Sequence, residues 1–332
     1  MLVNSVTGPV DTSTLGRTLT HEHVFVINRD LAFAFPDRVP VDAELEKFKN
    51  AIERLKPYGL GTIMDPSMID YGRDVLLLKR ASEMTGINIL ACTGKYFTEY
   101  PWYRFVRERP YPCVDEDILA DLFIRELTQG IQGTDIKAAF VKCATDDAYG
   151  FSTSNIAFIK AAGKAARETG RPVSTHGSCY SRQGLEQQRI LVEEAGVKPH
   201  CICLGHCFAG GDMEYVEEII KKGSYVGADQ MGITNIRSVE NYAKDIAKLL
   251  RKDKNYVDYI LLSHDATIYS DFGLSLSSRR CDPEKNTLLG DFHQIFEELP
   301  AFLEKEGVGQ EEFDKMTIDN PRRYIECRPL EH

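Results

Sequence analysis

Short apolar runs alternate with longer amphipathic stretches along the whole chain. In the stretch 42–59, apolar side chains recur at helical spacing and Gly59 follows as a stop signal, which predicts a helix. These side chains are Leu45, Phe48, Ile52 and Leu55. The same unit, an apolar run followed by an amphipathic stretch, occurs eight times. The apolar runs span residues 18–26, 61–67, 88–97, 136–145, 171–177, 200–207, 223–230 and 258–266.

Nearly continuous apolar runs that alternate with helices are typical of a parallel sheet buried on both faces. Eight such units predict an α/β fold of the (β/α)8 or TIM-barrel type, which takes about 250 residues and grows by loop insertions. An open doubly wound sheet is the alternative, but no Gly-x-Gly-x-x-Gly follows the first apolar run. No linker divides the chain, so we predict one domain over 1–329 and interpret 330–332, Leu-Glu-His, as a tag remnant.

Composition narrows the choice of function. The 332 residues carry a formal net charge of -10, which argues against nonspecific nucleic-acid binding and against attachment to an anionic membrane surface. No apolar run is long enough to span a bilayer, and the first residues lack the pattern of a signal peptide. Several of the nine cysteines lie inside apolar runs, which is typical of free thiols in a reducing compartment, so we predict a cytoplasmic protein. The segment "CICLGHC" lacks the spacing of a zinc-thiolate site.

The first apolar run, "GRTLTHEHVFV", contains two histidines that flank a glutamate. In an extended strand, alternate side chains face opposite ways, so His21 and His23 would share one face and Glu22 would take the other. Two imidazoles side by side can bind one metal ion. The alternative is a pair of core histidines with backbone partners.

Further polar residues stand at the ends of later apolar runs, where the catalytic residues of barrels lie. Lys142 and His176 are 34 positions apart, and His206 follows 30 positions later, so each step is about one unit. Asp265 comes 59 positions, or about two units, after His206. Since these residues recur at the spacing of the strand–helix units, we expect them to converge at the carboxyl end of the barrel. Each could instead be a satisfied core residue, but that explanation must then hold independently at every position.

Two of these positions need a further argument. His264 and Asp265 are adjacent, so only one of them can face the barrel axis, and we choose Asp265. Burial of Lys142 at the end of an apolar strand would lower its pKa. A neutral amine there could form a Schiff base, act as a general base, or add CO2 to become a carbamate that bridges two metals. A lysine that extends its ammonium group to solvent is the alternative.

With these residues in place, the chain resembles the phosphotriesterase-like family of the amidohydrolase superfamily, and most closely its lactonase branch, the phosphotriesterase-like lactonases. The resemblance extends over nearly the whole chain. It rests on "GPVDTSTLGRTLTHEHVFV", "IKAAFVKCATD", "VSTHG", "GLEQQRI", "LGHC", "LLSHDA" and "DNPRRYIE".

The resemblance implies a binuclear centre in which His21, His23 and Asp265 hold the more buried divalent ion. His176 and His206 would hold the second ion, and carboxylated Lys142 would bridge the two together with a hydroxide. Zinc is the first expectation, with manganese, cobalt or iron as the other metals that suit these ligands. The implied function is the hydrolytic opening of lactones, such as N-acyl-homoserine or other γ- and δ-lactones, with promiscuous phosphotriesterase activity. A homodimer acting on a small-molecule substrate is also implied.

Catalytic and substrate-binding roles follow from the same resemblance. Asp265 would take the proton in transit and deliver it to the leaving group. Tyr96 would point at the metal centre as a catalytic and substrate-binding residue, unless it is a loop-packing aromatic. Gln230 and the loop residues Arg279 and Arg280 are further candidates for substrate binding, the two arginines through a phosphate or carboxylate. The arginines could equally form a solvated loop face.

The chain departs from the lactonase branch in two places. Gln230 stands where that branch usually has arginine, and "CFAGGD" separates His206 from Asp212, where the family often has Gly-Asp almost at once. The alternatives are therefore a hydrolase of another carboxylic ester, an amide or an organophosphate triester. Other classes are a barrel that binds a small molecule without catalysis and a Schiff-base aldolase built on Lys142.

Overall fold

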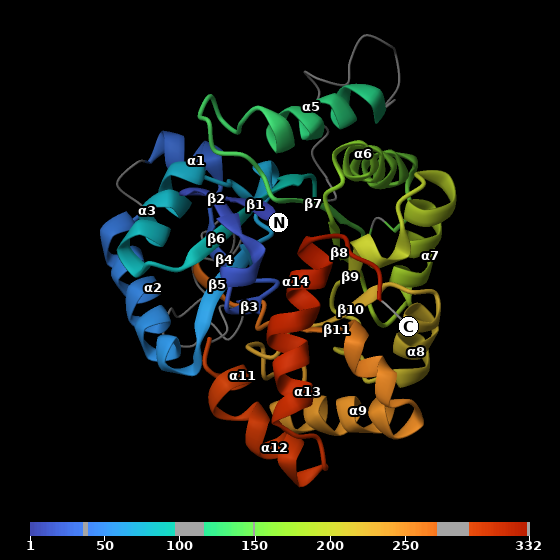
Figure 1. Cartoon of the computed structure of the whole chain (residues 1–332). Coiled ribbons are helices and arrows are strands. Elements are labelled where there is room, and N and C mark those ends of the chain that lie inside the picture. Colours follow the sequence, from blue (N-terminus) through green and yellow to red (C-terminus); the bar gives the residue numbers. More distant parts are fainter. Residues whose placement is uncertain (36–38, 97–115, 149, 271–291, 331–332) are drawn as a thin grey trace.

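The eight apolar runs supply the strands of one parallel sheet. The computed structural model describes residues 1–35, 39–96, 116–148, 150–270 and 292–330. Strands that are neighbours in this sheet follow one another along the chain, as the colour sequence in Figure 1 shows. In order they are β3 (Arg17–Leu19), β5 (Leu60–Asp65), β6 (Asn88–Gly94), β7 (Phe140–Ala144), β8 (Val173–His176), β9 (Ile202–Leu204), β10 (Tyr225–Ala228) and β11 (Ile260–Leu262).

The two edge strands of this sheet approach each other at their carboxyl ends. The Thr20 backbone N–H donates to the carbonyl of Leu262 at 3.4 Å, and the N–H of Asp265 donates to the carbonyl of His21 at 3.1 Å. The sheet therefore curls into a nearly closed barrel surrounded by helices, which confirms the predicted (β/α)8 fold.

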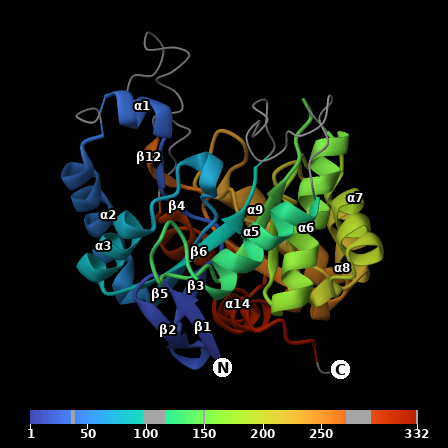
Figure 2. The same ribbon diagram turned by 90° about the horizontal axis from the view of Figure 1, so that it is seen from above.

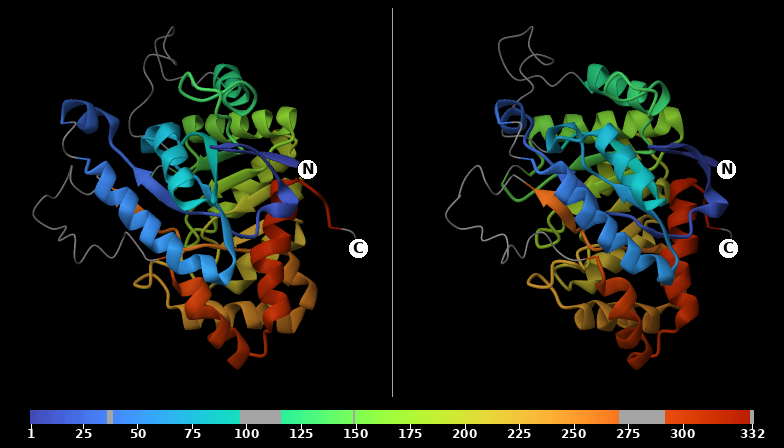
Figure 3. Two further views of the ribbon diagram at one scale, coloured as in Figure 1. Left: turned by 60° about the vertical axis from the view of Figure 1, so that its left-hand side comes forward. Right: turned by 90° about the vertical axis from the view of Figure 1, so that its left-hand side faces the viewer.

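The longer helices cover the outside of the barrel because they bury an apolar stripe against the strands. In α2, Leu45, Phe48 and Ile52 are fully buried, and the predicted stop at Gly59 has left-handed backbone with φ 88°. Figure 3 shows α2 and α3 side by side along one flank. None of the helices in the described part of the chain is long and apolar enough to cross a membrane. The helices are α1 (Arg29–Ala34), α2 (Val41–Leu55), α3 (Val75–Thr85), α5 (Glu116–Thr128), α6 (Thr153–Thr169), α7 (Gln183–Arg189), α8 (Met213–Lys221), α9 (Val239–Lys252), α11 (Gln294–Glu297), α12 (Leu299–Lys305), α13 (Gln310–Asp314) and α14 (Asn320–Ile325).

The first apolar run is not a single strand, which corrects the prediction for residues 18–26. Strand β3 ends at Leu19, and β4 (His23–Val26) begins a separate two-stranded parallel sheet with β12 (Thr267–Ser270). Between β3 and β4, the buried carboxylate of Glu22 accepts the backbone N–H groups of His264 and Ala266 at 2.7 and 3.0 Å. These bonds join the segment to the chain beyond β11, because a buried carboxylate needs donors that a continuing strand would not offer.

A hairpin that the sequence analysis did not predict precedes the barrel. It consists of β1 (Leu2–Ser5) and β2 (Gly8–Asp11), paired antiparallel. Figure 2 shows this hairpin and α14 at the end of the molecule where both termini lie. The ring of Tyr324 in α14 packs 5.6 Å from that of Tyr225 in the barrel strand β10. The carboxyl ends of the strands are at the opposite end of the barrel, where the candidate residues lie.

Candidate metal centre

The side chains of His21, His23 and Asp265 converge at the carboxyl end of the barrel. The Nε2 atoms of the two histidines lie 3.6 and 3.5 Å from Oδ1 of Asp265. These distances are long for hydrogen bonds. Two donors that each lie about 2.1 Å from one tetrahedral ion would be separated by roughly 3.4 Å. The three ligand atoms therefore have the spacing that a single metal ion requires.

Glu22 separates the two histidines and faces away from them. Its Oε1 accepts hydrogen bonds from the Ser263 hydroxyl at 2.8 Å and lies 2.9 Å from Nδ1 of His264. The structure thus places His264 on the far side of the chain and Asp265 with His21, and Asp265 has left-handed backbone with φ 54°. Because residues other than glycine rarely adopt this backbone, the turn indicates a local strain of about 1–3 kcal/mol that is kept to aim the carboxylate.

A second group lies next to the first. Nδ1 of His176 is 2.7 Å from Nε2 of His206, and Nε2 of His176 is 2.8 Å from the Tyr96 hydroxyl. His206 also has left-handed backbone, with φ 60°. The hydroxyl of Tyr96 therefore engages one ring nitrogen of His176, while the other ring nitrogen faces His206.

Lys142 is the buried amine of the same site. Its Nζ donates to the carbonyl of Thr175 at 2.7 Å, and the residue is 1% exposed. Burial lowers its pKa, as the sequence predicts, although the negative charges of Asp229 and Asp265 oppose this shift. Gly94 in the neighbouring strand β6 permits this packing, since a Cβ there would lie only 1.9 Å from the Lys142 carbonyl oxygen.

One cavity of about 210 Å³ is lined by all of these candidate site residues except His206. Five histidine, lysine and carboxylate side chains and the ring of Tyr96 line it, together with apolar side chains. The first set is His21, His23, Lys142, His176, Asp265 and Tyr96, and the apolar set includes Val26, Pro66, Met68 and Ile233. The donor types, imidazole nitrogen and carboxylate oxygen, suit zinc, manganese, cobalt and iron.

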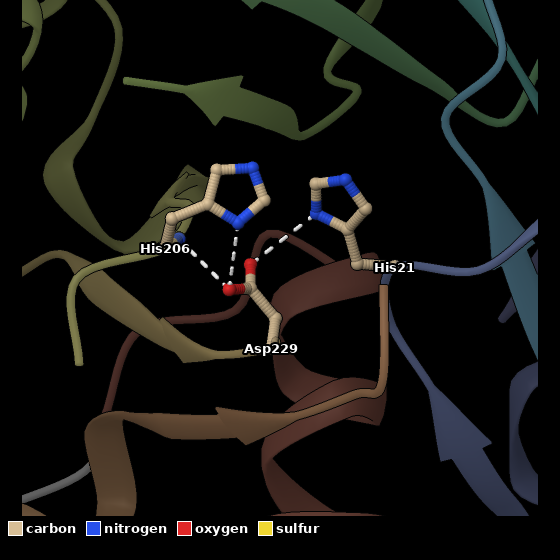
Figure 4. Close-up of side chains that lie close together, drawn as sticks. All are labelled: His21, His206 and Asp229. Carbon is tan, nitrogen blue, oxygen red and sulfur yellow. Dashed lines mark hydrogen bonds and ion pairs between the residues drawn. The ribbon is translucent and has the colours of Figure 1, made fainter. Parts of the chain in front are cut away.

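Asp229 is the residue that the sequence analysis missed. It directly follows β10, one of the strands to which no ligand had been assigned, and its position at the end of an apolar run was the available signal. Figure 4 shows its carboxylate between two of the histidines. Oδ2 lies 3.2 Å from Nδ1 of His21, and Oδ1 lies 3.0 Å from Nδ1 of His206 and accepts the backbone N–H of the same residue at 2.8 Å.

The histidines share one arrangement, in which a protein group engages one ring nitrogen of each. The Nδ1 atoms of His21 and His206 bond to Asp229, and Nδ1 of His23 lies 2.8 Å from the Ser67 hydroxyl. In these three rings the second nitrogen, Nε2, faces another side chain of the centre, which is Asp265 for His21 and His23 and His176 for His206. Such partners orient metal-binding histidines and select their tautomers. The arrangement therefore fits a metal centre.

The comparisons with known proteins agree with this geometry. The family model described as the Phosphotriesterase family matches residues 1–325. The chain belongs to the phosphotriesterase family. This confirms the predicted resemblance, and it makes the protein a metal-dependent hydrolase that acts on ester bonds rather than an aldolase or a non-catalytic barrel.

Relatives of this phosphotriesterase-family protein match it over nearly their full length. A "Phosphotriesterase homology protein" of Mycobacterium tuberculosis is 35% identical over 98% of this chain and 97% of its own. An "Aryldialkylphosphatase" of Saccharolobus solfataricus is 34% identical over 95% and 96%, respectively. A solved structure described as the phosphotriesterase from Mycobacterium tuberculosis covers 100% of both chains with a TM-score of 0.87 and 32% identity.

Burial and charge in this phosphotriesterase-family site set the protonation of His21 and Asp229. Burial, followed by the positive charge of Lys142, lowers the pKa of His21 to about 4, so that the imidazole is neutral. Burial alone would raise the pKa of Asp229, but the charge of His206 and the hydrogen bonds from the two histidines hold it well below its ordinary value. Asp229 is therefore ionised and both of its imidazole partners can act as donors.

The remaining predicted residues lie in different places. Gln230 Nε2 donates to Oδ2 of Asp265 at 3.0 Å, and Gln230 is not among the residues that line the cavity. Asp212 caps the start of α8 through the N–H of Tyr215 and pairs with Arg182, so it is part of a helix terminus. Arg279 and Arg280 lie outside the described residues. The structure thus brings Gln230 to the site as a partner of Asp265.

Proposed function

We propose that the protein opens lactones by metal-dependent hydrolysis, with organophosphate triesters as slower substrates. The observation that carries the proposal is the convergence of His21, His23, His176, Asp265 and the buried amine of Lys142 on one cavity of about 210 Å³. Membership of the phosphotriesterase family supports ester hydrolysis, and the aryldialkylphosphatase relative supports the triester side activity.

We assign two divalent ions to the two groups of donors. His21, His23 and Asp265 would hold one ion, and His176 and His206 would hold the other. Zinc is the proposed metal. Lys142 would span both as a carbamate, because its lowered pKa favours the neutral amine that adds CO2. When bound, the ions would polarise the substrate carbonyl and acidify the attacking water.

The protein groups supply the rest of the reaction. Val26, Met68 and Ile233 line the cavity and offer apolar contacts to a neutral acyl substrate. Asp265 would receive the proton of the attacking water and return it to the leaving oxygen. In a lactone the leaving oxygen stays covalently attached to the acyl group, so it remains near this carboxylate until the proton arrives.

The test is to reconstitute the protein with zinc and bicarbonate and to compare kcat/KM for γ- and δ-lactones with that for an aryl phosphotriester. We expect lactones to be ahead by orders of magnitude. Lys142→Ala should lose the bound metal and the activity. Lys137→Ala is the matched control, because Lys137 belongs to the same apolar run but lies outside the cavity. A Lys142→Ala protein that keeps both metal and activity would overturn the proposal.

The second candidate function is hydrolysis of an amide or another carboxylic ester. Gln230 motivates it, since this neutral amide stands where the lactonase branch usually has a cationic side chain. The same substrate panel decides the question. Turnover of amides with inert lactones would establish the second candidate and refute the first.

A further inference from the structure

A buried ion pair stands directly beside Tyr96. The turn η4 (Ile69–Tyr71) carries Asp70, whose Oδ2 lies 3.0 Å from Nζ of Lys95. The backbone N–H of Tyr96 donates to the same carboxylate, at 3.2 Å to Oδ1 and 3.1 Å to Oδ2. One carboxylate therefore holds two consecutive residues just after β6. We call Asp70, Lys95 and the Tyr96 N–H the clamp.

Burying the charges of the clamp costs desolvation free energy. Lys95 is only 1% exposed and the side chain of Asp70 is 15% exposed. A buried ion pair returns little net stability, because taking both charges out of water offsets most of their attraction. Stability alone therefore gives a weak reason for it, and its position suggests a stronger one.

The chain needs an anchor at this place. Strand β6 ends at Gly94, which has φ 126° and passes close to the Lys142 carbonyl. Glycine restricts the backbone less than any other residue, so the direction of the chain after it must be set by other contacts. The Lys95 N–H donates to the Lys142 carbonyl at 3.1 Å, and the hydrogen bonds that the Tyr96 N–H donates to Asp70 hold the next residue.

We propose that Asp70 is a positioning residue that acts through Tyr96 on His176. The Tyr96 hydroxyl lies 2.8 Å from Nε2 of His176, whose other nitrogen faces the second group of metal donors. Tyr71, adjacent to Asp70, packs its ring 4.6 Å from that of Tyr96 and 5.8 Å from that of His23. The inference rests on the proposed function, since it assigns Tyr96 and His176 to the working site.

The first test needs no substrate. Stepwise zinc binding to the metal-free protein is measured by competition with a chromophoric chelator for wild type, Asp70→Asn, Tyr96→Phe and the double variant. Partners that orient a metal-binding histidine contribute about 10- to 100-fold to affinity. We expect both single variants to weaken one of the two zinc sites about tenfold and to leave the other unchanged. The double variant should bind zinc no more weakly than the single variant with the lower zinc affinity, because both changes break the same chain of contacts.

The second test uses the lactone that wild type turns over best. Asp70→Asn should lower kcat about tenfold with little change in KM, and its effect should again not add to that of Tyr96→Phe. Asp245→Asn is the matched control. Asp245 pairs with Arg237, and its side chain is 12% exposed, but it lies on α9. This control should change neither zinc binding nor kcat.

Lys95→Met keeps the inference testable if Asp70→Asn does not fold. It removes the ion pair but leaves the acceptor of the Tyr96 N–H, so we expect a smaller loss in zinc affinity that again does not add to Tyr96→Phe. Additive effects in both tests, or wild-type zinc affinity in Asp70→Asn, would overturn the inference. If wild type hydrolyses no lactone while the zinc cycle is non-additive, the proposed function fails and the inference holds.

Discussion

Replacing Asp229 by asparagine is the sharpest single perturbation of the metal centre. The carboxylate accepts hydrogen bonds from Nδ1 of His21 and from both Nδ1 and the backbone N–H of His206. Asparagine has the same shape but only one carbonyl oxygen. If that oxygen keeps the two donors of His206, the amide NH2 faces Nδ1 of His21. The ring must then accept at Nδ1 and carry its proton on Nε2.

This change of tautomer removes a metal ligand without moving an atom far. Nε2 of His21 is the nitrogen that lies 3.6 Å from Oδ1 of Asp265, and a protonated nitrogen cannot bind a metal ion. If the amide group is flipped by 180°, its NH2 faces Nδ1 of His206 instead, and that ring must carry its proton on Nε2. Loss of such an orienting partner weakens metal binding about 10- to 100-fold, or about 1.4–2.7 kcal/mol.

The assay is chelator competition on metal-free Asp229→Asn, with circular dichroism to show that the variant is folded. We expect one zinc site to weaken by about 10- to 100-fold. Asp245→Asn serves as the control, because it changes an ion-paired carboxylate away from the centre. Zinc affinity within a factor of about two of wild type would refute the reasoning, since the measured range for such partners begins near tenfold.

Three further predictions concern stability, measured as the free energy of urea unfolding of the metal-free protein. Glu22→Gln should lower the free energy of unfolding by about 3–5 kcal/mol, because the buried carboxylate accepts four hydrogen bonds and the NH2 group of glutamine would face one of these donors. A loss below about 1 kcal/mol would contradict this. Burial lowers the pKa of His21 to about 4, while an unfolded histidine titrates near 6.5, so the unfolded chain takes up this proton first. Stability should therefore fall by about 3 kcal/mol on this account between pH 6.5 and 4, and His21→Asn should remove this share of the pH dependence. Phe48 is fully buried in α2, so Phe48→Ala should lower the free energy of unfolding by about 3–5 kcal/mol. Phe33 is 92% exposed, so Phe33→Ala should stay within about 0.5 kcal/mol of wild type. Similar losses for both variants would contradict the packing of α2 described above.

The barrel could be predicted from the sequence because its signal is local. A strand buried on both faces must be apolar throughout, and the helix over 42–59 must repeat its apolar side chains every turn. The order of the units then determines which strands are neighbours, since sequential strands in such folds lie side by side. This is why the residues at the ends of successive strands, Lys142 and His176 among them, could be grouped before the structure was known.

Contacts between distant segments could not be predicted in the same way. The break after Leu19 depends on the bonds of Glu22 with residues more than 240 positions away. Asp229 was missed because its position at the end of an apolar run does not by itself distinguish a site residue from a hydrogen-bonded core residue. Gln230 was assigned to substrate binding from the resemblance to the lactonase branch, whereas in the structure its amide donates to Asp265.

The sequence by itself therefore determined the barrel, the family and the residue types at the carboxyl ends of its strands. The barrel follows from periodicity, which each segment carries independently of the others, and the family follows from the resemblance of several motifs along the chain. Only the tertiary structure decided which nitrogen of each histidine is engaged, which carboxylate orients which ring, and how Asp70 connects to Tyr96. Those features are distances of about 3 Å between groups from different strands, and hydrogen bonding at that range exists only once the chain has closed on itself.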